Sequence, residues 1–222
     1  MSERIENTYL TMQKQNPMKR TIQSTIILCA LLLGVNLTMA QSKTYDVKSF
    51  EEVIISPHIE VVFEKADTQS VVIENINVGY DKLNVEVKGK TLHIYLDDAK
   101  VYTKSKKVES DDYSGKHAVY DGTIVSAKVY YTDVDMISLR GEESHKLTSK
   151  LTGDEFKLML YGEPKVYVSD MDLDEFQVTL YGEAYLEVEN GRAQRQKIVS
   201  YGESEVNTLG VNNSSAKITA YG

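Results

Sequence analysis

Tyrosine recurs every 20 residues in the second half of the chain, at Tyr161, Tyr181, Tyr201 and Tyr221. If successive repeats stack as strands about 4.8 Å apart, the four rings form an exposed aromatic strip. Such a strip suits sugar rings or a partner protein. The rings could instead serve stability alone by stacking on one another, at a few tenths to about 1 kcal/mol per pair. The spacing therefore indicates binding or packing, and not bond-breaking chemistry.

Three lysines stand four residues before tyrosines of this column, at Lys157, Lys197 and Lys217. Side chains alternate across a strand, so residues four apart share one face. The lysines therefore flank the rings, and the seven residues together form the predicted binding strip. In the alternative without a ligand, the lysine stems pack on the rings.

A second column is acidic, with Glu163, Glu183 and Glu203 each following a repeated glycine and Glu142 extending the column. Neighbouring carboxylates about 4.8 Å apart repel by roughly 0.9 kcal/mol per pair in water. A calcium ion would relieve that repulsion, because carboxylate oxygens are its preferred ligands. The repeat lacks the Gly- and Asp-rich nonapeptide of calcium-binding β-rolls, so we predict solvated glutamates and no metal.

The remaining ionisable residues do not form a recognisable catalytic or metal motif. Five acids fall in a polar stretch, where acids are usually solvated, although a metal or acid/base cluster is the alternative: Asp97, Asp98, Asp111, Asp112 and Asp121. The histidines lack zinc-ligand spacing: His58, His93, His117 and His145. A phosphate-binding loop, a nucleophile elbow and an HExxH motif are all missing from the sequence. We therefore expect no catalytic residue, no cofactor and no metal.

The elements that must position these residues follow from a glycine repeat. Gly141, Gly162, Gly182, Gly202 and Gly222 are spaced 21, 20, 20 and 20 residues apart. A period near 20 suits one coil of a β-solenoid and is too short for the common helical repeats. Apolar residues of one parity lie between the glycines and must face inward, while each glycine suits a corner with positive φ. We predict an all-β chain, a right-handed parallel β-helix-like solenoid with rungs of roughly 20 residues.

We expect residues 41–222 to form a single solenoid domain. Residues 41–96 alternate in period two and predict N-terminal strands, including a hairpin around Gly89 and Lys90. Residues 97–122 are rich in Lys, Asp and Ser and predict a long polar loop. Residues 123–222 carry the Tyr-Gly-Glu rungs.

The first 40 residues are typical of a secretory signal peptide. A basic cluster at residues 14–20 precedes an apolar run over residues 26–35, and small residues lead to an expected cleavage site after Ala40. The run is shorter than the roughly 18 residues of a spanning helix, which disfavours the alternative of an uncleaved anchor. The polar residues before Met18 are consistent with an over-extended start, so residues 1–17 are excluded from the fold.

Cleavage would leave a strongly acidic chain. Residues 41–222 hold 21 Lys and Arg against 31 Asp and Glu, a net charge of −10. Such a surface repels nucleic acid and anionic lipid, so neither is an expected partner, and no membrane span is expected after cleavage. The single cysteine, Cys29, lies in the signal, so the mature chain has neither a disulfide nor a thiol nucleophile.

Four segments carry a resemblance to a known family: residues 50–55 (FEEVII), 59–63 (IEVVF), 90–94 (KTLHI) and 151–158 (LTGDEFKL). Over most of residues 50–222 the chain resembles the family described as putative auto-transporter adhesin, head GIN domain, secreted or envelope proteins of Gram-negative bacteria. The resemblance implies a β-helix-like fold and a cell-surface or periplasmic setting, and it supplies no catalytic residues. Family members usually carry Ser-Gly-Ala or Ser-Gly-Ser where this chain has Tyr-Gly-Glu.

These patterns together predict a non-enzymatic protein, secreted, periplasmic or at the cell surface. It would bind a glycan or an envelope protein through the strip of tyrosines and lysines. One alternative is a polysaccharide-active enzyme on a β-helix, which the scarcity of arginine after residue 40 (Arg140, Arg192 and Arg195) and the absence of a convergent acid set disfavour. Another is a structural or regulatory envelope protein without a ligand. The oligomeric state is left open.

Overall fold

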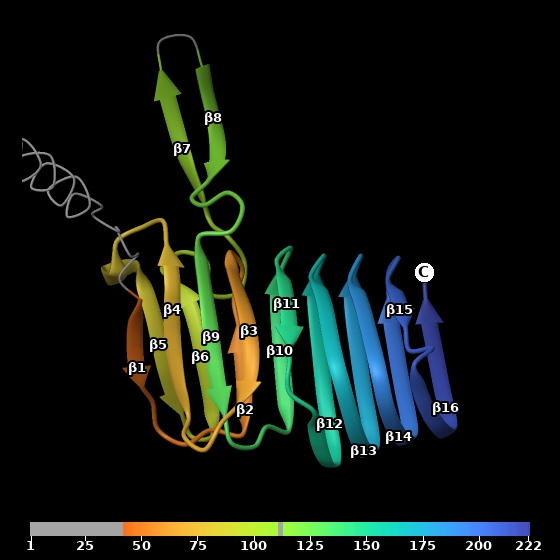
Figure 1. Ribbon diagram of the computed structural model, residues 1–222. Coiled ribbons are helices and arrows are strands. Elements are labelled where there is room, and N and C mark those ends of the chain that lie inside the picture. Colours follow the sequence, from red (N-terminus) through yellow and green to blue (C-terminus); the bar gives the residue numbers. More distant parts are fainter. Residues whose placement is uncertain (1–41, 111–112) are drawn as a thin grey trace, which may run out of the picture. The chain divides into compact units, whose positions relative to one another are not determined.

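The computed structural model describes residues 42–110 and 113–222 (Figure 1). The predicted signal peptide and two acids of the polar stretch, Asp111 and Asp112, lie outside the described residues. Within the described ranges the chain consists of strands with one short 3-10 turn, η1 (Tyr80–Lys82), and contains no α-helix. The all-β prediction is confirmed.

The strands of the first half are short, and the four longest strands that the structure describes lie in the second half. The first half contains β1 (Lys43–Asp46), β2 (Glu52–Ile55), β3 (Ile59–Lys65), β4 (Ser70–Ile76), β5 (Leu83–Lys88), β6 (Thr91–Leu96), β7 (Ser105–Ser110) and β8 (Tyr113–Ala118). The second half contains β9 (Val125–Tyr131), β10 (Met136–Gly141), β11 (Ser144–Leu147), β12 (Leu151–Gly162), β13 (Lys165–Gly182), β14 (Tyr185–Tyr201), β15 (Glu205–Asn207) and β16 (Val211–Tyr221).

Successive coils of the second half stack in parallel register. In Figure 1 the strands β12, β13, β14 and β16 lie side by side in chain order. Each residue pairs with the one a full repeat later, so that Leu160 lies opposite Leu180 and Tyr181 opposite Tyr201. The coils form a β-solenoid of about four turns, as predicted. Sequence repetition therefore becomes spatial alignment.

The core consists of the inward residues of each coil, aligned in columns. Leu158, Leu160 and Leu180 are fully buried, and the Phe156 and Phe176 rings stack with centroids 6.2 Å apart. Each such side chain contributes roughly 1.5–3 kcal/mol when buried, before the cost of ordering the chain. Because a coil buries its side chains against the coils above and below, no coil is stable by itself.

The repeated glycines lie at corners, where the backbone requires them. Gly162, Gly182 and Gly202 have φ values of 96°, 117° and 118°, a region that other residues rarely adopt. A Cβ atom at Gly182 would also lie 2.4 Å from the carbonyl oxygen of Gly162. Both the positive φ and the close approach of the coil below exclude a side chain at this corner.

The first half of the chain extends the stack and then departs from the pure solenoid pattern. Strands β2 and β3 pair in parallel with β10 and β11, which continues the coils. Beyond them the pairs β5–β6, β4–β9 and β1–β4 are antiparallel. The β5–β6 hairpin turns at Gly89, with φ 62°, where the sequence predicted it.

The polar segment 97–122, expected to be a long loop, contains a hairpin. Strands β7 and β8 pair with each other as a separate two-stranded sheet. Its sequence alternates poorly between apolar and polar residues, which explains why the pattern did not reveal it. Across the described part of the chain, no helix is long and apolar enough to cross a membrane.

Candidate functional site

The four repeated tyrosines form one continuous stack, here called the tyrosine ladder (Tyr161, Tyr181, Tyr201 and Tyr221). Centroids of successive rings lie 4.9, 5.0 and 4.9 Å apart, and the ring planes are within 9° of parallel. The centroid spacing matches the spacing of adjacent strands, so the rings stand one per coil. The structure therefore brings all four predicted residues together.

The stacking decides which part of each ring a partner can meet. Because neighbouring rings cover one another's faces, the ladder offers ring edges and phenol hydroxyls to the solvent, and not the flat faces that the sequence suggested. Exposure rises along the stack, with Tyr181, Tyr201 and Tyr221 at 39%, 43% and 56%. A ring edge carries partial positive charge and the hydroxyl both donates and accepts hydrogen bonds, so the ladder suits oxygen-rich partners.

The predicted lysines line up in a neighbouring column of the same face. Strand register aligns Lys157, Gln177, Lys197 and Lys217 across four coils. The Nζ atom of Lys157 lies 2.7 Å from Oε1 of Glu155, so this lysine is already paired with a carboxylate.

A shallow groove runs between the lysine column and the tyrosine ladder. It has a volume of about 170 Å³ and its floor includes Thr179 and Val199. Tyr181 and Tyr201 form one wall, while Gln177 and Lys197 form the other. We call the outward surface made of the lysine column, the groove and the tyrosine ladder the ladder face.

Among the residues that the structure describes, the other predicted candidates do not form a metal-binding cluster. The glutamate column (Glu142, Glu163, Glu183 and Glu203) is exposed to solvent. Asp97 and Asp98 form ion pairs with lysines. The carboxylate of Asp97 lies 3.9 Å from Nζ of Lys82, and that of Asp98 lies 2.9 Å from Nζ of Lys104. Among residues 42–110 and 113–222, no cluster of His, Cys, Asp and Glu could hold a metal ion.

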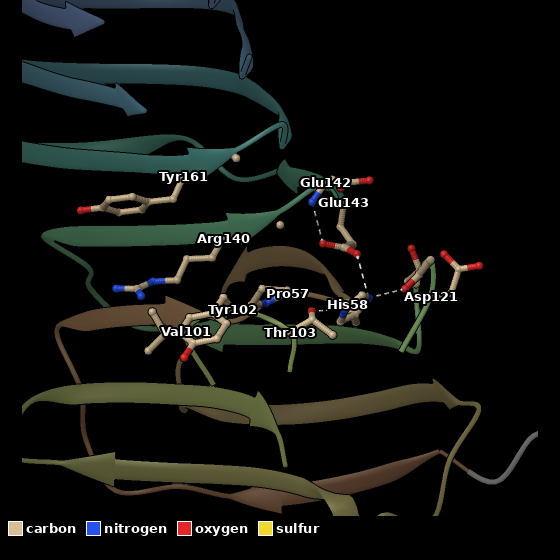
Figure 2. Close-up of a pocket in the computed structure, with 14 residues that line it drawn as sticks. Pro57, His58, Val101, Tyr102, Thr103, Asp121, Arg140, Glu142, Glu143 and Tyr161 are labelled. Carbon is tan, nitrogen blue, oxygen red and sulfur yellow. Dashed lines mark hydrogen bonds and ion pairs between the residues drawn. The ribbon is translucent and has the colours of Figure 1, made fainter. Parts of the chain in front are cut away.

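A second candidate site lies at the first glycine corner, where the 97–104 and 121–123 segments approach the coil (Figure 2). This corner pocket has a volume of about 490 Å³, within the range of small-molecule sites. Figure 2 shows Arg140 and Tyr161 toward one end and His58, Glu143 and Asp121 toward the other. Tyr161 belongs to both sites, so the corner pocket joins the end of the tyrosine ladder.

Polar contacts order the end of the corner pocket that contains His58 and Glu143. The ring nitrogens of His58 lie 2.7 Å from the carbonyl oxygen of Gly122 and 2.6 Å from Oγ1 of Thr103. Glu143 is 6% exposed, accepts a hydrogen bond from the backbone N–H of Glu142, and lies 4.0 Å from His58. Burial raises the pKa of Glu143, partly offset by that backbone hydrogen bond and by His58.

At the end of the corner pocket next to the tyrosine ladder, Arg140 occupies the position that tyrosine has in the later coils. Its register partner on the next coil is Tyr161, and its guanidinium carbon lies 5.1 Å from the Tyr161 ring centroid. This cation–π contact closes the end of the tyrosine ladder. The Arg140 side chain is half-buried, and its Nε atom is buried without a hydrogen-bond partner.

Sequence reasoning missed the corner pocket, although the repeat held a signal for it. Residues 140–145 read RGEESH, where the later coils read YGEPKV, YGEAYL and YGESEV. Aligning the coils would have marked Arg140 in the tyrosine column, Glu143 at a position otherwise occupied by Pro164, Ala184 or Ser204, and His145 in an apolar column. All three departures fall within six residues, and two of them line the corner pocket.

The third departure, His145, faces the core. It is fully buried beside Val61 and Val166, and neither ring nitrogen has a hydrogen-bond partner. Burial alone lowers the pKa of His145 to about 3, so the ring is neutral at neutral pH. An unpaired imidazole in an apolar column destabilises the fold and does not contribute to a site.

Comparisons with known proteins agree with this architecture. A family model described as putative auto-transporter adhesin, head GIN domain, matches residues 49–222. No curated protein matches the chain.

Solved structures of proteins from Parabacteroides and Bacteroides species are similar in fold. A putative adhesin from Parabacteroides distasonis has a TM-score of 0.55 and 18% identity, covering 81% of this chain and 77% of that one. A putative lipid binding protein from the same species has a TM-score of 0.53 and 15% identity, covering 81% and 78%. A putative adhesin from Bacteroides fragilis has a TM-score of 0.51 and 16% identity, covering 82% and 93%. At these identities the likeness establishes the fold alone.

Proposed function

Because the chain belongs to the family described as putative auto-transporter adhesin, head GIN domain, we propose that it is a non-enzymatic, secreted or envelope-associated protein that binds glycans through its ladder face. The family description favours a surface or extracellular location. The partner in this proposal is an extended carbohydrate of the cell surface or its surroundings.

The stacked tyrosine ladder is the observation that carries this proposal. Its rings repeat every 4.9–5.0 Å, and each coil adds the same hydroxyl and ring edge to the row. A polymer whose own hydroxyls repeat along a line can engage several coils at once, so weak contacts add up. The shallow groove beside Tyr181 and Tyr201 gives such a chain a path along the coils.

Catalysis on the ladder face is disfavoured by the chemistry of its side chains. Hydrolysis of a glycosidic bond ordinarily needs two carboxyl groups facing each other across the substrate. The groove is lined by amide, hydroxyl, ammonium and apolar groups, and none of its lining residues is acidic. This surface therefore suits binding without turnover.

Retention on a glycan array, measured for the wild type and Tyr181→Ala, tests the proposal. We expect Tyr181→Ala to lose at least about tenfold in apparent affinity, because it removes a hydroxyl and breaks the ladder in the middle. Tyr167→Ala is the matched control: Tyr167 is outward-facing and half-buried, but belongs to a different face of the coil.

A degradation assay on the retained glycans separates the alternatives. Release of reducing ends by the wild type would favour the enzyme. Equal retention of Tyr181→Ala and Tyr167→Ala would exclude the ladder face as the binding surface. Absence of retention on every glycan would favour a structural protein without a ligand.

A further inference from the structure

The first coil departs from the repeat at the corner pocket, and the departure changes the charge of the tyrosine column. Every later coil places a neutral tyrosine in the ladder column, whereas the first coil places the cationic Arg140 there. The chain carries a net charge of −8, so an arginine at this position is a local exception to an acidic surface. A planar guanidinium matches the two oxygens of a carboxylate better than any other side chain does.

Arg140 is held in place but lacks an anion. Its guanidinium stacks on the Tyr161 ring, while no carboxylate of the described residues lies within ion-pair distance of it. The other two arginines after residue 40 are paired, Arg192 with Asp172 at 2.7 Å and Arg195 with Glu175 at 3.1 Å. The half-buried Arg140 therefore keeps its hydrogen-bonding capacity for a group from outside the chain.

A second cation, Lys100, lies on the Arg140 side, while the carboxylates of Asp121, Glu142 and Glu143 lie toward the other end of the corner pocket (Figure 2). Lys100 packs its ammonium 4.0 Å from the centroid of the Tyr95 ring. Burial first, and then the charges of Lys100 and Arg140, lower the pKa of His93 to about 4. Two fixed cations and a neutral imidazole thus lie near this end of the ladder face, where an anion would be attracted.

The rest of the corner pocket offers what a sugar ring needs. Tyr102, 71% exposed, provides an aromatic surface beside Arg140, and Asp121 and Glu142 provide carboxylate acceptors for hydroxyl groups. The volume of about 490 Å³ accommodates one or two sugar units. Gly141 and Gly162 line the pocket between the two ends with backbone atoms alone.

We propose that the corner pocket binds a carboxylate-bearing sugar unit, with Arg140 pairing with the carboxylate and the acidic end accepting hydrogen bonds from the hydroxyls. The inference rests on the proposed function and deepens it: the glycan that follows the ladder face is an acidic one, and its charged unit is seated next to Tyr161. A cation would be repelled by Arg140, and a neutral sugar would leave the guanidinium unpaired.

Isothermal titration of the protein with D-glucuronate, D-glucose and acetate tests the assignment. We expect glucuronate to bind at least about tenfold more tightly than glucose or acetate, with the preference abolished in Arg140→Gln and reduced in Arg140→Lys, which keeps the charge but loses the fork. Arg192→Gln is the control, because it removes an arginine that is already paired with Asp172 and lies in a different part of the coil. Circular dichroism verifies that each variant is folded.

The outcomes separate this inference from the proposed function. If Arg140→Gln binds glucuronate as tightly as the wild type does, the proposed role of Arg140 is wrong. If acetate binds as tightly as glucuronate, the proposal that the pocket recognises a sugar ring is wrong. Equal binding of glucose and glucuronate overturns the acidic assignment. If Arg140→Gln abolishes the preference for glucuronate while Tyr181→Ala still binds polymeric glycans like the wild type, the assignment of the corner pocket is supported. The ladder face is then excluded as the binding surface.

Discussion

The regular coils and the first glycine corner share one backbone but have different chemistry. Gly141 pairs with Gly162, and Gly162 with Gly182, so the corner is built the same way each time. The regular coils fill its flanks with Tyr, Pro, Ala, Ser and apolar residues, whereas the first coil has Arg140, Glu143 and His145. The inward columns and corner glycines fix the backbone, which leaves the flanking side chains free to vary. A departure from the repeat therefore marks where a solenoid can hold a distinct site.

The largest contrast is expected between inward and outward positions of a regular coil. Leu180→Asp buries an unpaired charge and should destabilise the fold by about 4 kcal/mol or more. Its neighbour Thr179 faces outward, and Thr179→Asp should cost well under 1 kcal/mol. Urea unfolding of the two variants measures the difference. Comparable midpoints would contradict the assignment of the inward columns.

The corner glycines should be the next most sensitive positions. Gly182→Ala places a Cβ 2.4 Å from the carbonyl oxygen of the coil below, at φ 117°, and should cost about 2 kcal/mol or more. Gly89→Ala has a positive φ of 62° but nothing within 4 Å of the added atom, so it should cost only about 1 kcal/mol. Thermal unfolding of the pair separates backbone strain from coil contact. A larger loss at Gly89 would show that the coils do not approach at the corner.

The buried histidine of the first coil, His145, should lower the stability of the protein. His145→Val removes two unpaired ring nitrogens and restores the apolar column, so we expect it to stabilise the protein by about 1–2 kcal/mol. The reciprocal change Val166→His, one coil further on, should destabilise by a similar or larger amount. Chemical denaturation at pH 8 provides both values. Loss of stability in His145→Val would mean that the imidazole has a partner.

His145 should also give the protein a pH dependence. Its pKa is about 3 when folded and about 6.5 when unfolded, so below about pH 6.5 the unfolded chain takes up a proton that the native state refuses. Stability should therefore be complete above pH 6.5 and fall toward pH 4, by up to about 1.4 kcal/mol per pH unit from this residue. His93, whose pKa is also lowered, acts in the same direction. Denaturation curves of the wild type and His145→Val across this range should diverge as the pH falls, and parallel curves would contradict the burial.

The smallest effect is expected within the tyrosine ladder. Tyr181→Ala removes two ring stacks and Tyr221→Ala only one, so their costs should be about 1 and 0.5 kcal/mol. The melting temperatures of the two variants provide the comparison. A cost several times larger at Tyr181 would indicate that the ladder exists chiefly for stability, and would weaken its role in binding.

Much of the regular region could be predicted from the sequence because its signals are local. The 20-residue glycine spacing, the parity of the apolar residues and the Tyr-Gly-Glu triplet all report on one coil that repeats. They predicted the stacked coils, the corner glycines and the alignment of Tyr161 with Tyr181. The orientation of the rings was not accessible, because whether stacked residues present faces or edges depends on side-chain torsions that spacing does not encode.

The corner pocket could not be predicted by the same route. It combines His58, segment 97–104 and residues 140–143, which are brought together only by the fold. The hairpin β7–β8 was hidden for a related reason, since its strands pair only with each other, as a sheet separate from the solenoid. The sequence does show that residues 140–145 (RGEESH) depart from the Tyr-Gly-Glu pattern of the later coils. Only the structure shows that this departure lines a pocket.

In the proposed mode of binding, the tyrosine ladder and the first corner form one continuous surface for an acidic glycan. The most direct test is a two-dimensional NMR titration of the labelled protein with a glucuronate-containing oligosaccharide. Shifts should concentrate on the amides of residues 140–143 and on the outward residues around Tyr161, Tyr181 and Tyr201, leaving Arg192 and Tyr167 unmoved. Shifts confined to the face of Tyr167, or spread evenly over the molecule, would contradict the account.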